Sequence, residues 1–85
     1  METETIVTFA ENEKYYLSAE TVQNNIKYFL ANKLDADEEL TIEATIFEEI
    51  KYDDGYYLDE VKNEKMLHFL TAVFTSNMIS EVDEM

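Results

Sequence analysis

The clearest pattern along the chain is a strict alternation of apolar and polar residues over positions 40–46. Successive side chains of a strand point to opposite faces, so this stretch predicts a strand with one buried face. That buried face would carry Leu40, Ile42, Ala44 and Ile46. Asp53, Asp54 and the only glycine, Gly55, then predict a turn that returns the chain through a partner strand over residues 56–58.

Two further stretches have strand character, and two have the spacing of helices. Residues 5–9 and 14–17 are rich in β-branched and aromatic side chains and predict a first hairpin. Over residues 19–34 apolar side chains recur at spacings of three and four, which predicts a helix capped by Ser18. A last helix is predicted over residues 64–80, with Asn63 as its cap and apolar side chains around most of its circumference.

These elements predict an α+β fold, in which an antiparallel sheet of about four strands, made of two hairpins, packs against two helices. Short identities recur at offsets of 40 or 41 residues, such as Tyr15-Tyr16-Leu17 and Tyr56-Tyr57-Leu58. They raise the idea of a ββα-ββα pseudo-repeat, although a biased composition also produces such matches by chance. We expect one compact domain over residues 1–85, with a frayed acidic tail from about residue 81.

Charge changes this picture more than any motif does. Twenty acidic residues face six lysines and no arginine, so the formal net charge is −14 at pH 7. A disordered acidic tail would not carry 46% apolar and 13% aromatic residues, so we expect a folded domain. Self-repulsion of this size costs stability and indicates a basic partner, whereas nucleic acids and anionic membranes would repel the chain. No apolar stretch long enough to span a membrane is present, and the acidic N-terminus is unlike a signal peptide, so a cytoplasmic protein is expected.

The sequence offers little for catalysis. There is no cysteine, and the single histidine, His68, lies within an apolar stretch of the last predicted helix, where a core or boundary role is expected. One glycine cannot build a phosphate-binding loop, and twenty acids make any one carboxylate pair uninformative. Residues 35–39 begin like a calcium loop but lack its glycine and its distal glutamate. We therefore expect no enzyme activity, no metal and no cofactor.

The acidic side chains are the remaining candidates for a binding surface. Carboxylates two residues apart on a strand are about 6.6 Å apart, a spacing comparable with successive phosphates of a nucleic-acid strand. The candidate partner-binding residues are Glu43, Glu48, Glu49, Asp53, Asp54, Tyr56, Asp59 and Glu60. The alternative is a solvated face that only keeps the protein soluble. A candidate homodimer face on the last helix consists of Leu67, Val73, Phe74 and Met78.

In size, acidity and mixed α and β content, the whole chain resembles the DNA-mimic inhibitors of phages and mobile elements, such as the uracil-DNA glycosylase inhibitor and acidic anti-CRISPR and antirestriction proteins. The resemblance assigns no residues. It implies a cytoplasmic, non-enzymatic inhibitor that occupies the nucleic-acid-binding channel of a host defence nuclease. Two alternatives stay open: an immunity protein or antitoxin that neutralises a basic nuclease toxin, and an acidic dimeric structural or assembly subunit.

Overall fold

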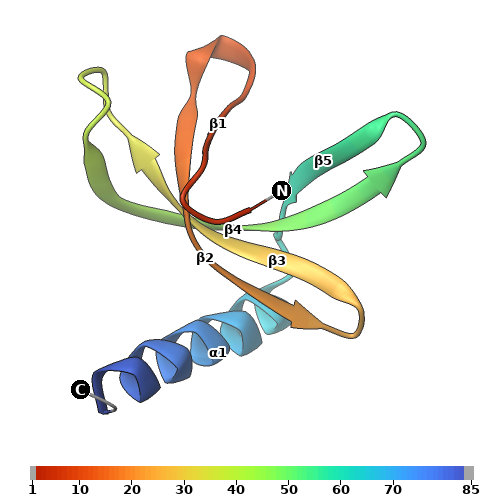
Figure 1. The fold of residues 1–85 in the computed structure, drawn as a ribbon, viewed down its shortest axis with the longest axis vertical. Coiled ribbons are helices and arrows are strands. Elements are labelled where there is room, and N and C mark those ends of the chain that lie inside the picture. The colour runs from red at the N-terminus through yellow and green to blue at the C-terminus, as the bar shows by residue number, and fades with distance from the viewer. Residues whose placement is uncertain (1, 84–85) are drawn as a thin grey trace.

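The computed structural model describes residues 2–83, with side chains placed through residue 76 except at residue 10. Five strands are followed by one helix (Figure 1). The elements are β1 (Ile6–Thr8), β2 (Lys14–Gln23), β3 (Ile26–Leu34), β4 (Leu40–Tyr52), β5 (Gly55–Glu60) and α1 (Glu64–Asp83), with a short 3-10 turn (Ala10–Asn12) between β1 and β2. The four strands and two helices expected from the sequence are therefore wrong, and so is the ββα-ββα pseudo-repeat, because the first unit has no helix.

The five strands form one antiparallel sheet in which every strand pairs with its neighbour in the chain, in the order β1-β2-β3-β4-β5. The sheet is strongly curved, and α1 crosses beneath it on one side (Figure 1). The hairpin of β4 and β5 extends away from the helix. This arrangement leaves the second hairpin accessible from more than one side.

The predicted helix over residues 19–34 is instead the hairpin of β2 and β3. Gln23 pairs with Ile26, so Asn24 and Asn25 form a two-residue turn. Their φ angles are 53° and 65°, both in the left-handed region that asparagine tolerates better than most residues. Such a turn matches the twist of the flanking strands and favours a hairpin over a helix.

The helical spacing was misleading because β3 is buried on both faces. One buried cluster, here called the inner cluster, consists of Leu17, Phe29, Ala31 and Phe47, with Val7, Phe9, Tyr15 and Leu58 packed against it. The outer cluster, on the side of α1, consists of Tyr28, Ile46, Leu70 and Phe74. A strand buried on both faces has a nearly continuous apolar run rather than a period of two.

The alternating strand is confirmed as part of β4, but of its predicted buried face only Ile46 is buried, and Ala44 is exposed. Leu40 is 60% exposed and Ile42 is fully exposed, whereas Ile46 and its neighbour Phe47 are both buried. The pairing of β3 with β4 is irregular between Leu34, opposite Leu40, and Asn32, opposite Ala44. The strand is therefore buried on both faces at its middle and exposed at its start.

The second hairpin and the last helix agree with the predictions made from the sequence. Tyr52 pairs with Gly55 across the turn, and the φ of Gly55 is 143°, which L side chains rarely adopt. The backbone N–H of Met66 donates to Oδ1 of Asn63 at 3.0 Å, which confirms the predicted cap. Leu70 and Phe74 bury the side of α1 that faces the sheet. The described part of α1 has no stretch apolar enough to cross a membrane.

Candidate partner-binding surface

The β4–β5 hairpin carries acidic side chains on both of its faces. Residues opposite each other in a ladder share a face, and faces alternate along the strand. Glu60 lies opposite Phe47 on the inner face. One step along, Asp59 lies opposite Glu48, and this pair is on the outer face. Glu49, opposite Leu58, returns to the inner face.

Glu48 and Asp59 place two carboxylates directly across from each other. Like charges in that position destabilise a sheet. Glu48 is half-buried and lies near the phenol of buried Tyr28. Burial raises the pKa of Tyr28 above its usual value of 10.0, and the charge of Glu48 raises it further. The outer face of the hairpin therefore holds negative charge next to the core.

The tip of the hairpin combines exposed carboxylates with exposed tyrosines. Asp53 and Asp54 are exposed, and the hydroxyl of Tyr57 donates to Oδ2 of Asp54 at 2.9 Å. This hydrogen bond is the main reason why the pKa of Tyr57 is raised. The rings of Tyr57 and Tyr52 meet edge to face, with centroids 5.0 Å apart. On the inner face the Nζ of Lys51 lies 6.0 Å from the ring centroid of Tyr56.

Two lysines of β2 and β3 form ion pairs with nearby carboxylates. Lys14 pairs with Glu38, and that hydrogen bond lowers the pKa of the carboxyl. Lys27 pairs with Glu20 across β2 and β3 at 3.0 Å. Residues 47–60 contain six acidic side chains and one lysine, Lys51.

Seven of the eight predicted partner-binding residues fall on the hairpin, and one does not. Glu43 lies on the part of β4 that precedes the pairing with β5, and its Oε2 is 4.0 Å from Nζ of Lys33. The predicted set does not include Tyr52 and Tyr57, which are about half-exposed beside the acids. The residues brought together are Glu48, Glu49, Asp53, Asp54, Tyr56, Asp59 and Glu60.

The predicted dimer face is mostly occupied by the chain itself. Phe74 is 3% exposed in the outer cluster, and Leu67 packs against that cluster. Val73 is half-buried, and Met78 lies outside the described side chains, as does the acidic tail from residue 81. Among the three residues of this face with described side chains, a second copy would find Leu67 and Val73 partly open and Phe74 covered.

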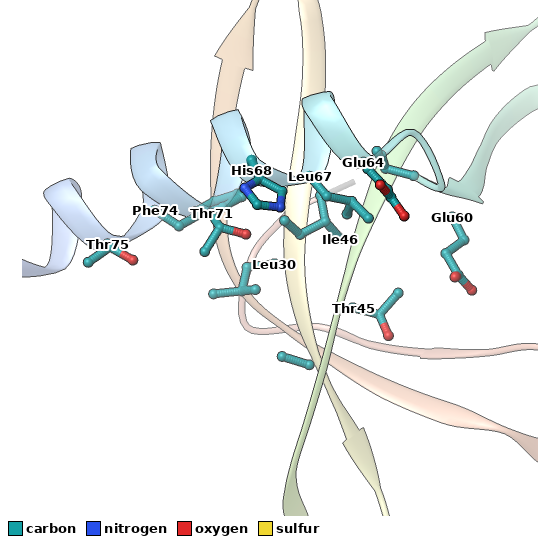
Figure 2. Close-up of a pocket in the computed structure, with 12 residues that line it drawn as sticks. Leu30, Thr45, Ile46, Glu60, Glu64, Leu67, His68, Thr71, Phe74 and Thr75 are labelled. Carbon is teal, nitrogen blue, oxygen red and sulfur yellow. The ribbon is translucent and has the colours of Figure 1, made fainter.

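A groove of about 740 Å³ separates α1 from β4 (Figure 2). Its floor is apolar, and the carboxylates of Glu60 and Glu64 lie at one end while Thr75 lies toward the other. His68 is exposed on the helical rim, beside Thr71, and makes no hydrogen bond or ion pair within the described part of the chain. Among the described side chains, no group of three or more potential ligands is arranged to hold a metal ion.

Comparisons of the chain with known proteins found no match. The chain matches no protein-family model, and neither a curated protein nor a solved structure matches it significantly.

Proposed function

We propose that the protein is an acidic DNA-mimic inhibitor whose β4–β5 hairpin enters the nucleic-acid-binding surface of a host defence nuclease. The observation that carries this proposal is the placement of carboxylates on both faces and at the tip of one projecting two-stranded ribbon. A groove that normally surrounds a nucleic-acid strand contacts its ligand from several sides. A ribbon with acids on one face only could pair with the basic groups on one side of such a groove.

The opposed carboxylates of Glu48 and Asp59 support the same proposal. Their repulsion is unfavourable in the free protein and is relieved when a positive group lies against them. A basic groove also releases its counterions when a polyanion enters, as it does with DNA, and long-range attraction speeds the encounter. Binding of a basic partner would therefore remove a repulsion that destabilises the free hairpin.

Tyrosines at the tip can supply the fixed contacts that charge alone does not. Tyr52, Tyr56 and Tyr57 are 54%, 47% and 49% exposed. Tyrosine gives large contact area with a polar end and is enriched among residues that dominate interface energy. We expect the acids to govern the rate of association and the tyrosines to govern the rate of dissociation.

The test compares two variants of equal net charge. Asp53→Asn/Asp59→Asn removes two acids from the hairpin, and Asp37→Asn/Glu39→Gln removes two exposed acids from the β3–β4 connection. Each is used as bait in a lysate of the host cell, and the captured protein is then purified and assayed for DNA binding and cleavage.

We expect wild type and the control to capture a nuclease and to block its DNA binding competitively, with affinity at least tenfold higher than the hairpin variant. Equal inhibition by both variants would remove the hairpin from the interface. A captured protein that does not bind nucleic acid would refute mimicry. A nuclease toxin encoded beside this gene would favour the immunity-protein alternative, which uses the same surface.

A further inference from the structure

The inner face of the sheet holds a hollow of about 360 Å³, and Glu60 is the one acid of the hairpin that lines it. Three aromatic residues, Phe9, Tyr15 and Phe47, form its wall. The rings of Phe9 and Phe47 stack with centroids 5.1 Å apart, and Tyr15 meets both edge to face, at 5.7 Å from Phe9 and 5.2 Å from Phe47. Phe9 and Tyr15 are only half-buried, so part of this aromatic surface remains accessible.

The other polar residues that line the hollow are all acidic. Glu11 and Glu13 come from the connection between β1 and β2, and Glu60 comes from the end of β5, opposite Phe47. All three are exposed, and no lysine is among the described lining residues. The remaining lining residue is Leu58 of the inner cluster.

A backbone hydrogen bond closes the β1–β2 connection at this position. The N–H of Phe9 donates to the carbonyl of Glu13 at 2.7 Å, which closes the loop. Glu11 and Asn12 have φ angles of 64° and 62°. This loop places Glu11 and Glu13 beside the aromatic wall.

From this charge complementarity we infer that the hollow is a docking site for an arginine side chain of the basic partner. A guanidinium group stacks on aromatic faces and donates two parallel hydrogen bonds to a carboxylate, which an ammonium group cannot do. The hollow offers the accessible parts of Phe9 and Tyr15 and three carboxylates from two different segments. The inference rests on the proposed function for the partner's basic character, and the hollow shares Glu60 with the hairpin surface.

The test uses small probes, so it does not require the partner. N-acetyl-arginine methylamide is titrated into the full chain and followed by amide NMR shifts, beside the corresponding lysine and citrulline compounds. Citrulline keeps the shape of arginine and lacks its charge. We expect saturable binding of the arginine probe, centred on Phe9, Tyr15 and Glu13, and about fivefold or more tighter than either comparison compound.

Two variants of equal net charge locate the site. Glu11→Gln/Glu13→Gln should weaken the arginine probe about tenfold, whereas Asp37→Asn/Glu39→Gln should leave it within twofold of wild type. Equal binding of citrulline, equal binding of lysine, equal effects of the two variants or shifts elsewhere would each overturn the inference.

The hairpin variant Asp53→Asn/Asp59→Asn separates this inference from the proposed function. It should bind the arginine probe as wild type does, even where it no longer captures a nuclease. Loss of both probe binding and nuclease capture by this variant would refute the hollow alone. Retained probe binding with nuclease capture at the wild-type level would refute the hairpin alone.

Discussion

At the residue scale, the pairing of Glu48 with Asp59 has consequences for both stability and binding. Asp59→Asn removes one of two like charges that face each other, so the free energy of unfolding should rise by about 0.2–1 kcal/mol. Urea denaturation measures this change. Asp37→Asn, in an exposed turn, removes the same amount of negative charge and serves as the control.

The same substitution should weaken association with the basic partner. A residue that lowers the stability of the free protein while it strengthens binding is typical of functional surfaces. If Asp59→Asn instead destabilises the sheet more than the control does, the carboxylate of Asp59 has a stabilising role, and repulsion from Glu48 is not its main effect.

Tyr28 gives the protein a predictable sensitivity to alkali. Its pKa is raised in the folded state by burial and by Glu48, whereas an unfolded tyrosine ionises near pH 10. Between pH 10 and the folded-state value, the unfolded chain has lost a proton that the native state retains. The free energy of unfolding should therefore fall as the pH rises through this window.

Tyr28→Phe tests this prediction because it keeps the ring and removes the ionising group. The variant should lose less stability than wild type between pH 9.5 and 11, as measured by urea denaturation at each pH. Tyr57→Phe is the comparison, because the raised pKa of Tyr57 arises mainly from its hydrogen bond to Asp54 at an exposed site. Identical pH profiles for wild type and Tyr28→Phe would contradict the prediction.

At the scale of elements, the turn between β2 and β3 decides between a hairpin and a helix. Asn25 has a φ of 65°, so Asn25→Ala should cost about 1–2 kcal/mol, while Asn25→Gly should be neutral or stabilising. In a helix the order would be reversed, because alanine favours helices and glycine opposes them. Urea denaturation of the two variants therefore tests the hairpin through the sign of their difference.

This turn also explains which elements could be predicted from the sequence. The β4–β5 hairpin has a glycine beside two aspartates, and α1 has a capping asparagine and more than three turns of apolar residues. Both signals are local. Residues 19–34 carry apolar residues on both faces of β2 and β3, which gives helical spacing by coincidence, and the only contrary local signal is the Asn24-Asn25 pair.

In the candidate site, too, local sequence signals predicted some residues correctly and others not. The acids next to the predicted turn came together because the turn fixes the register of the ladder. Glu43 did not join them, because β4 is 13 residues long and β5 pairs only with its second half. The arrangement of Phe9, Tyr15 and Phe47 depends on contacts between the loop that follows β1 and the strands β2 and β4, which no local pattern in the sequence records.

At the scale of the whole molecule, a net charge of −14 on 85 residues acts against folding. Added salt screens charges at the surface, and the Debye length falls from about 10 Å at 0.1 M to about 3 Å at 1 M. Raising NaCl from 20 to 500 mM should therefore raise Tm in a thermal melt. Association with a basic partner should slow over the same range, since its steering is screened as well.

The hairpin variant Asp53→Asn/Asp59→Asn makes this prediction specific to the surface proposed for binding. It should have a higher Tm than Asp37→Asn/Glu39→Gln at 20 mM NaCl, and the two should converge at 500 mM, because their net charges are equal and only the placement of the removed acids differs. A Tm difference that persists at high salt would assign it to local packing or hydrogen bonding. A Tm that does not change with salt in any of the three proteins would mean that the negative charges are far enough apart to be screened by water alone. That result would remove the electrostatic argument for a concentrated binding surface.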